Sequence, residues 1–227
     1  MKMKVIVDTS AGEKHLSALK LIANNNDCEI LGVTLSWVDY ATVEQICAVA
    51  SANVPVYAGC PGAMVRYLYQ KNAKIPAPVQ LPMQLQKEHA VAFLIGACRN
   101  AEEPVTIVAL DALTNIGTAL RIAPDIAGKI REVLIIDRVQ KGAFASENIQ
   151  KDPEAAQILV QRGVPIAVVQ LDPDAESASG LCAMDNQLGQ QINVQICVDR
   201  GLGAGALLCS RDRTPNARII TQKDITG

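Results

Sequence analysis

The sequence predicts an α/β protein with a doubly wound, mostly parallel sheet and helices on both of its faces. Two observations predict this fold. Short runs rich in β-branched residues alternate with amphipathic stretches from residue 4 to residue 170, as in proteins whose parallel strands are joined by helices. After about residue 180 the alternation gives way to apolar runs broken by Gly and Asn, which predict a small antiparallel C-terminal extension.

The predicted elements follow that alternation along the chain. Strands are expected in six apolar runs bounded by turn residues, at 4–7, 30–35, 54–57, 105–110, 133–136 and 165–170. Helices are expected in five stretches whose apolar residues recur with helical spacing, at 14–23, 42–52, 87–100, 113–122 and 153–162. The antiparallel extension would use 194–198, 206–209 and 218–221. Residues 71–86, rich in proline, are the expected long loop.

Length and composition favour a single domain over residues 1–227, because 49% hydrophobic content is ample for a buried core. The 21 basic and 23 acidic residues give a net charge of −2 without a long run of either sign, so neither a nucleic-acid-binding nor a membrane-binding surface is expected. No apolar stretch approaches the ~18 residues of a membrane span, and no signal-peptide pattern is present. We therefore expect a cytoplasmic protein whose partners are small molecules or proteins.

The cysteines and histidines give no metal-binding pattern. Seven cysteines are scattered without a CxxC spacing, and most lie in apolar segments, which is typical of buried reduced thiols. The two histidines, His15 and His89, are too few for a histidine-rich metal site.

Acidic residues stand at or near the carboxyl ends of five predicted strands. They are Asp8, Asp39, Asp111, Asp137 and Asp172. In an open parallel sheet the ligand crevice lies at that edge, so converging carboxylates could hold a hard cation or hydrogen-bond sugar hydroxyls. Aspartate is also favoured in turns and at helix N-caps, which explains any one of these residues without a site. Both interpretations stay open at this point.

Five segments in this order resemble the nucleoside hydrolase family of the inosine-uridine type. They read VIVDTSAG, VPVYAGC, TIVALDALTNIGTAL, NIQKDPEAAQILVQRGVPIAVVQLD and RTPNARI. The most specific matches are ALTNIGTAL and KDPEAAQILVQRGVPI. The resemblance implies a nucleoside hydrolase-like sheet, a calcium ion at its carboxyl edge, and hydrolysis of the bond between ribose and base. Such cleavage passes through a ribosyl cation, and the family's calcium ion holds the sugar diol and the attacking water.

The opening loop departs from the family pattern, which reads Asp-Thr-Asp-Pro-Gly followed by two further aspartates. Asp8 and Gly12 are kept, but Ser10 stands at the position of the catalytic base and metal ligand. Lys14 and His15 stand where the family has paired aspartates. An ammonium group would repel a calcium ion, so we predict that the calcium site is lost and that no cofactor is bound.

Other positions implied by the resemblance are also altered. The backbone-carbonyl ligand position falls at Leu110, and Asp111 follows where the family has glycine. Asp137 and Arg138 replace a Gly-Gly pair. Ser146 replaces a ribose-binding glutamate, Asn148 keeps the ribose-binding asparagine, and Asp39 takes the place of an asparagine after the second strand. After Asp172 the chain goes almost directly to its last strands, without the family's His-Asp pair, so it resembles a shortened and divergent member.

In one interpretation the chain is a non-hydrolytic descendant, a pseudoenzyme that keeps the sheet and a ribose-sized pocket and serves in binding or assembly. Its expected ligand is a ribose-containing small molecule. The expected ligand-binding residues are Asp8, Ser10, Asp39, Arg138 and Asn148.

In the alternative, the chain is an N-glycosidase with a rebuilt, metal-free site that acts on a ribonucleoside or nucleotide-like ligand. Lys14 would place its ammonium near the former metal position, a carboxylate would act as base, and Arg138 would bind a 5′-phosphate. The candidate catalytic residues are Lys14, His15, Asp39, Asp111 and Asp137. Lys14 and His15 also fit a solvated helix surface, and Arg138 also fits a structural salt bridge.

A third interpretation concerns assembly, because helices that cover part of the sheet in the family have no counterpart here. Exposed apolar surface tends to be covered by association, so we expect a homo-oligomer or a partner subunit. Two further residues are expected to be structural. Asp152 precedes Pro153 and Glu154 as a helix N-cap would, and Asn115 is expected to fix the turn before its helix.

Overall fold

The computed structural model describes residues 2–10, 13–36, 40–50, 53–65, 85–138, 147–171 and 218–221. Seven strands within these residues form one sheet, in the order β3-β2-β1-β4-β5-β6-β7. The strands are β1 (Met3–Thr9), β2 (Cys28–Leu35), β3 (Val56–Ala58), β4 (Val105–Ala109), β5 (Ile130–Arg138), β6 (Ile166–Leu171) and β7 (Arg218–Thr221). Neighbouring strands from β3 to β6 pair in parallel, and β7 pairs antiparallel to β6.

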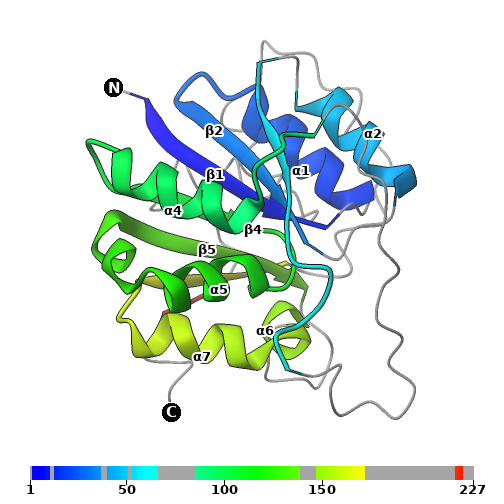
Figure 1. Ribbon diagram of the computed structural model, residues 1–227. Coiled ribbons are helices and arrows are strands. Elements are labelled where there is room, and N and C mark those ends of the chain that lie inside the picture. Colours follow the sequence, from blue (N-terminus) through cyan, green and yellow to red (C-terminus); the bar gives the residue numbers. More distant parts are fainter. Residues whose placement is uncertain are drawn as a thin grey trace.

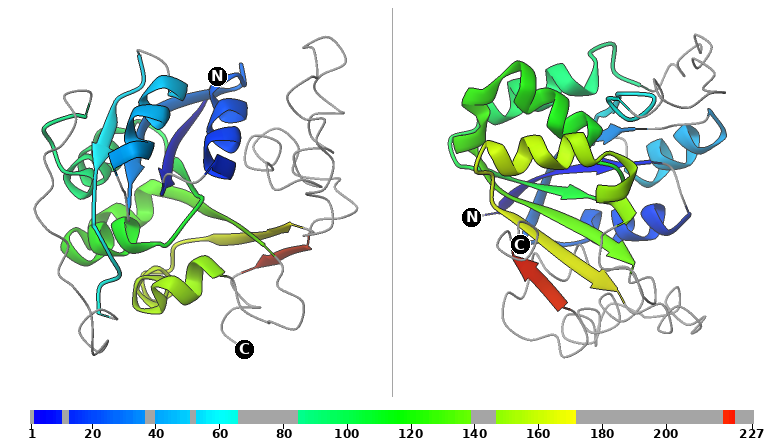
Figure 2. Two further views of the ribbon diagram at one scale, coloured as in Figure 1. Left: turned by 90° about the vertical axis from the view of Figure 1, so that its right-hand side faces the viewer. Right: turned by 90° about the horizontal axis from the view of Figure 1, so that it is seen from below.

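Helices cover both faces of the sheet (Figure 1 and Figure 2). They are α1 (Glu13–Ala23), α2 (Tyr40–Val49), α4 (Ala90–Asn100), α5 (Thr114–Ile122), the 3-10 helix η1 (Pro124–Lys129), α6 (Glu147–Lys151) and α7 (Pro153–Gln161). One apolar cluster joins α1 and α2 to one face, and a second joins α4, α5 and α7 to the other. The doubly wound fold expected from the sequence is therefore confirmed.

Strand β1 shows how the alternation of side chains positions the site. Val5 and Val7 belong to the cluster of α1 and α2, whereas Ile6 belongs to the cluster of α4, α5 and α7. Because successive side chains point to opposite faces, Asp8 lies on the face of Ile6, beneath α5. The chain runs outward from β1 through β2 to β3 and then crosses back to β4. The reversal of strand order between β1 and β4 makes their carboxyl ends the expected crevice.

The predicted elements are all present where the structure describes them, with different ends. The helix expected at 87–100 begins at Ala90, because the His89 side chain accepts a hydrogen bond from the Val91 amide and caps it. The strand expected at 133–136 is longer in the structure, where β5 spans Ile130–Arg138. The antiparallel extension is confirmed at β7, whereas 194–198 and 206–209 lie outside the described residues, as does most of the loop expected at 71–86. The sequence did not predict η1 or α6.

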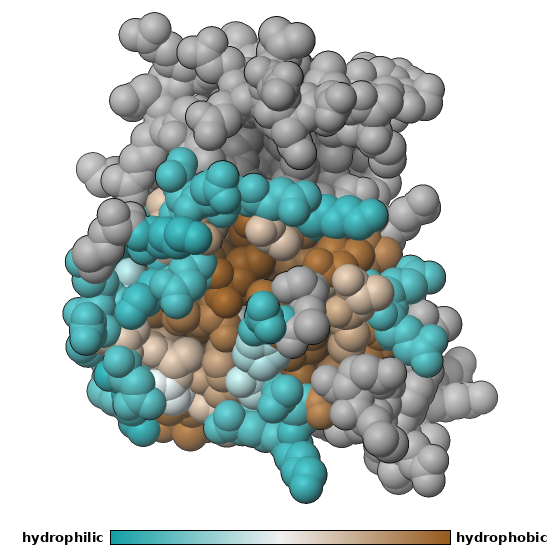
Figure 3. All heavy atoms as spheres, turned by 90° about the horizontal axis from the view of Figure 1, so that it is seen from above, coloured by the Kyte–Doolittle hydropathy of each residue, from teal (hydrophilic) through white to brown (hydrophobic). Residues whose placement is uncertain are grey.

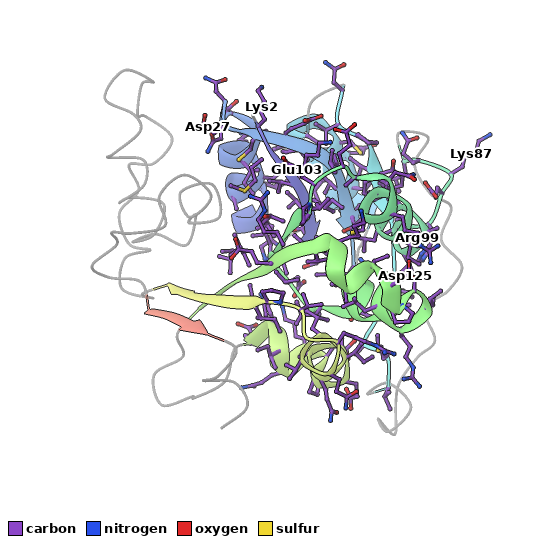
Figure 4. All side chains as sticks on the ribbon, turned by 90° about the vertical axis from the view of Figure 1, so that its left-hand side faces the viewer. Lys2, Asp27, Lys87, Arg99, Glu103 and Asp125 are labelled. Carbon is purple, nitrogen blue, oxygen red and sulfur yellow. The ribbon has the colours of Figure 1, made fainter. Side chains whose placement is uncertain are left out.

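The charged side chains labelled in Figure 4 lie away from the carboxyl edge of the sheet. Arg99 of α4 donates two hydrogen bonds to Asp125 of η1, at 2.7 and 2.8 Å. Both side chains are about half exposed, so this ion pair contributes little to stability. Among the described residues, no helix has the length and hydropathy needed to cross a membrane.

Candidate functional site

Asp8 lies at the carboxyl end of β1 and is fully buried. Its Oδ1 accepts hydrogen bonds from Thr34 Oγ1 at 2.6 Å and from Asn115 Nδ2 at 2.8 Å. Its Oδ2 is buried and has no hydrogen-bond partner among the described residues. Because buried polar atoms are nearly always bonded, this oxygen is the one most clearly available to a ligand.

Ser36, which directly follows β2, offers a second open atom nearby. Its amide donates to the Thr9 carbonyl at 2.9 Å, but in the part of the chain that the structure describes its buried Oγ has no hydrogen-bond partner. Strand pairing sets Asp8 beside Thr34, and Ser36 follows Thr34 by two residues. The alternation of strand side chains therefore puts the Ser36 hydroxyl on the same face as the Asp8 carboxyl.

Asn115, the second residue of α5, joins the ends of three strands. Besides its bond to Asp8, its Nδ2 donates to the Leu35 carbonyl at 3.1 Å, and its Oδ1 accepts from the Cys60 amide at 2.8 Å. Gly59 permits this close approach, since a Cβ there would overlap the Asn115 amide. The structural role expected for Asn115 is thus confirmed, and it extends beyond the turn before α5.

The environment of Asp8 changes its acidity. Burial raises the pKa of Asp8 from its ordinary value of 3.8 to about 7. The hydrogen bonds from Asn115 and Thr34 partly offset this rise, and the negative charge of Asp111 adds to it. A carboxyl with such a pKa is protonated in a large fraction of molecules near neutral pH, so Asp8 can either accept or donate a hydrogen bond there.

Asp111 follows β4 on the same face of the sheet and is buried. Its Oδ1 accepts a hydrogen bond from Lys151 Nζ, which forms an ion pair between β4 and the last residue of α6. The ammonium also lies 3.9 Å from the Glu147 carboxylate. Sequence reasoning did not identify Lys151. The sequence held one signal for it: a lysine stands directly before Asp152, and Asp111 stands where the family has glycine, so the two residues bring opposite charges that could pair.

A hydrogen bond joins Ser10, at the start of the opening loop, to His15 in the first turn of α1. His15 Nδ1 is hydrogen-bonded to the Ser10 carbonyl oxygen. A carbonyl only accepts, so Nδ1 carries the proton and, in the neutral ring, Nε2 keeps the free lone pair. Ser10 and His15, which stand at two of the positions where the resemblance implies metal-binding carboxylates, therefore engage each other.

Asn148 and Asp152 hold the helices beneath the site. Asn148 is buried in α6, and its Nδ2 donates to the Ile136 carbonyl of β5 at 2.9 Å. Asp152 caps α7 through a bond from the Ala155 amide at 3.1 Å, which confirms the expected N-cap. Its Oδ2 also accepts from Thr114 Oγ1 at 2.6 Å and from the Met64 amide at 3.0 Å.

The structure thus brings together Asp8 and Asp111 from the expected site residues, and it pairs Ser10 with His15. Asp39 lies outside the described residues. Lys14 falls in α1, and Asp137 and Arg138 fall in β5, but their side chains lie outside what the structure describes. The ligand-binding and catalytic roles of all these residues stay predictions.

Comparisons with known proteins point to one family. The sequence model of the family described as inosine-uridine preferring nucleoside hydrolase matches residues 5–193. The pyrimidine-specific ribonucleoside hydrolase RihB of Escherichia coli (strain SE11) is 31% identical over 188 residues, which cover 75% of this chain and 60% of that protein. The chain therefore spans about 60% of the length of the curated relatives it matches.

Solved structures of lower identity share the fold. An inosine-guanosine nucleoside hydrolase superposes with a TM-score of 0.64 at 18% identity, covering 100% of this chain and 91% of the other. The type III effector protein XopQ, solved in complex with adenosine diphosphate ribose, gives a TM-score of 0.53 at 15% identity over 78% of this chain and 59% of the other. At these identities the likeness concerns the fold alone.

Proposed function

The chain belongs to the inosine-uridine preferring nucleoside hydrolase family, and from this premise we propose that it binds a ribose-containing small molecule without calcium and without hydrolysing it. One observation carries the proposal: polar groups at or next to the altered positions are already hydrogen-bonded within the chain. His15 donates to the Ser10 carbonyl, and the Lys151 ammonium donates to Asp111. Groups that are already paired in this way are poor ligands for a metal ion.

Calcium does not fit the described part of the site. The ion takes about six to eight oxygen ligands, most of them anionic or carbonyl oxygens. Here Asp8 offers one open oxygen, Asp111 is neutralised by an ammonium, and the Ser10 carbonyl is occupied by His15. No step of the proposed function therefore uses a metal ion.

The open atoms of the site suit a sugar hydroxyl. Asp8 Oδ2 and Ser36 Oγ are both buried and have no partner within the described ranges, and they lie on one face at adjacent strand ends. A hydroxyl can donate to one such oxygen and accept from the other, which satisfies both. The complex of XopQ with adenosine diphosphate ribose supports the ligand class, since it is a related fold that holds a ribose.

Binding without hydrolysis is supported by the charges of Asp8, Asp111 and Lys151 at the site. Cleavage of a ribosyl bond requires negative charge beside the developing sugar cation and a base for the attacking water. The Asp111 carboxylate is compensated by Lys151, and burial keeps Asp8 partly protonated at neutral pH. Asp8 and Ser36 would bind and orient the sugar, while Lys151 opposes the charge that cleavage creates.

One observation favours a second candidate, metal-free hydrolysis. A carboxyl with a pKa of about 7 is well matched to proton transfer at neutral pH, so Asp8 could accept the proton of a water. The other candidates for this role are Lys14, His15, Asp39, Asp111 and Asp137. This alternative predicts turnover that a chelator leaves unchanged.

The test combines calorimetry and turnover on the same protein. In buffer with a chelator, inosine, uridine, ribose 5-phosphate and adenosine diphosphate ribose are titrated into the chain, and released free ribose is measured with each nucleoside. We expect saturable binding of at least one probe, no ribose release, and no change when calcium replaces the chelator. Ribose release in the chelator would establish the second candidate, and absence of binding to all four probes would contradict both.

Matched variants locate the binding. Asp8→Asn keeps an acceptor for Thr34 and Asn115 but removes the open carboxylate oxygen, so we expect at least a tenfold loss of affinity at pH 8. That loss corresponds to about 1.4 kcal/mol, close to the lower end of the range for a hydrogen bond to a charged group. Asp125→Asn is the control, because η1 precedes β5 and lies at the opposite edge of the sheet. Equal losses in both variants would place the ligand elsewhere.

We also propose that the chain associates with a second copy or a partner subunit in the cytoplasm. Figure 3 supports this, since hydrophobic residues gather at the centre of the face it shows, with hydrophilic residues around them. Sedimentation equilibrium tests association directly, and a monomer mass at tens of micromolar chain would contradict self-association.

A further inference from the structure

We propose that the Lys151 ammonium is the resident cation of this site, a tethered charge that compensates the buried carboxylates at the carboxyl edge and replaces a bound metal ion. The inference builds on the proposed function, because it gives a physical reason why the site operates without calcium. It holds equally for a binding site and for a metal-free catalytic site.

Three buried carboxyl groups create the need for a cation. Asp8, Asp111 and Asp152 are 0%, 3% and 0% exposed. All three lie around the first turn of α5: Asp8 bonds to Asn115, Asp152 bonds to Thr114, and Asp111 precedes the helix. The positive end of the helix dipole offsets part of this charge, but carboxylates that are close together and shielded from water still repel one another.

Within the described residues, Lys151 is the cation that contacts this group. Its Nζ donates to Asp111 Oδ1, and its side chain is 32% exposed against 4% for Asp111. The ammonium therefore enters from the solvent side and meets a carboxylate that water barely reaches. A buried carboxylate left without a partner is strongly destabilising, so Asp111 depends on this contact.

The backbone of Lys151 is held by hydrogen bonds of the residues before it and after it in the sequence. Before it, Asn148 fastens α6 to β5 through the Ile136 carbonyl. After it, Asp152 is held by Thr114 and by the amides of Met64 and Ala155. Lys151 lies between these two anchors, so its backbone is fixed before the charge pairs, and little further ordering is needed.

A tethered ammonium differs from a metal ion in testable ways. It neutralises one carboxylate through hydrogen bonds and needs no shell of oxygen ligands, and a chelator cannot remove it. Removing the ammonium leaves Asp111 unpaired beside Asp8 and frees carboxylate oxygens for another cation. Lys151→Met should therefore create cation affinity that the natural chain lacks.

The experiment compares four proteins: the unaltered chain, Lys151→Met, Asp111→Asn, and the double variant with both changes. Midpoints of urea unfolding are measured in chelator and in 10 mM calcium chloride, and calcium binding is measured by calorimetry. We expect the midpoint of Lys151→Met to fall and calcium to restore part of the loss, with affinity at least tenfold above that of the unaltered chain. The double variant should recover most of the midpoint and bind no calcium.

Each outcome decides the inference. Micromolar calcium binding to the unaltered chain, or an unchanged midpoint in Lys151→Met, would overturn it. If Lys151→Met does not fold, recovery of folding in the double variant supports the inference, whereas failure of both variants would show that the lysine stem, not its charge, is required. The ligand and ribose assays of the unaltered chain test the proposed function separately, since they can fail while Lys151 still replaces the metal.

Discussion

Two regions meet at the carboxyl edge of the sheet, and they use their polar side chains differently. In the region of α5 and α7, Asn115 and Asp152 each make three hydrogen bonds to surrounding groups. In the region of the opening loop, Asp8 has one buried oxygen without a hydrogen-bond partner among the described residues, and the Ser10 carbonyl accepts from His15 and from the Thr9 hydroxyl. The first region holds strands and helices together, whereas the second retains a buried oxygen that can still accept a hydrogen bond from a ligand.

This difference in hydrogen bonding indicates which parts of the family pattern are needed for the fold. The segments that match the family most specifically include Asn115 and Asp152, whose side chains each bond to three groups of the chain itself. Close packing supports them, since a Cβ on Gly117 of α5 would come within 2.8 Å of Ala155 in α7. Among the described residues, the side-chain bond of His15 stays within the loop and the start of α1, so substitution at this position leaves the bonds of the other elements unchanged.

The largest expected effect comes from breaking the first region at Asp152. Asp152→Ala removes the cap of α7 and leaves Thr114 and the Met64 amide without an acceptor. Loss of a cap and two further bonds to a charged group should lower the free energy of unfolding by about 4 kcal/mol. Urea unfolding measures the loss, with Asp125→Asn as a charge-matched control in the exposed ion pair of η1. A loss below about 1 kcal/mol would mean that Asp152 is only a local cap.

A slightly smaller loss is expected at Asn115. Asn115→Ala removes the link among β1, β2 and β3 and leaves the Cys60 amide and the Leu35 carbonyl without this partner. Three lost hydrogen bonds in a buried site should lower the free energy of unfolding by about 3 kcal/mol. The same unfolding measurement applies, and Asn115→Asp should be at least as damaging because it places a second carboxylate against Asp8. Recovery of stability in Asn115→Asp would contradict the bonding described here.

The sequence allowed the local features of this edge to be predicted. Strand β1 was predicted from an apolar run, and the cap of α7 from an Asp-Pro-Glu series, because both depend on neighbouring residues. Helix α6 was missed because five residues are too few to show a helical period. The later start of α4 came from the His89 cap, which the periodicity does not encode.

The contacts that define the site join residues far apart in the sequence. Asp8 and Asn115 are separated by 107 positions, and Asp111 and Lys151 by 40. The acidic strand ends predicted a polar edge, but the sequence analysis did not single out Lys151 among the lysines as the partner of Asp111. That pairing depends on how α6 packs against β5, which is a property of the whole fold.

The contrast between the two regions can also be tested through the pH dependence of the free energy of unfolding, to which Asp8 contributes. The folded-state pKa of about 7 lies above the ordinary value of 3.8, so the unfolded chain loses its proton first as pH rises. Stability from this group is therefore complete below the unfolded-state pKa and falls by about 1.4 kcal/mol per pH unit until the folded-state pKa is reached. Between pH 5.5 and 7 the loss should total about 2 kcal/mol.

Asp8→Asn isolates this contribution, because asparagine keeps an acceptor for Thr34 and Asn115 and does not ionise. The charged or titratable groups that face Asp8 are Asp111 after β4 and Cys60 after β3. Both remain in the variant, so only the Asp8 contribution disappears. Unfolding free energies measured from pH 5 to pH 8 should fall less steeply in Asp8→Asn than in the unaltered chain. Parallel profiles would mean that Asp8 ionises at its ordinary pKa in the folded protein.

The smallest effect is expected in the opening loop, and it tests whether that region is as dispensable to the fold as its bonding indicates. His15→Ala removes the bond to the Ser10 carbonyl, a half-exposed contact, and should lower the free energy of unfolding by less than about 1 kcal/mol. His15→Asn, whose amide can still donate to that carbonyl, is the matched control. Hydrogen exchange of the first amides of α1 should quicken in the alanine variant alone, because the loop loses its one described tie to the helix. A loss as large as that of Asn115→Ala would instead show that the two regions support the fold equally, and the contrast between a fixed scaffold and an adaptable loop would fail.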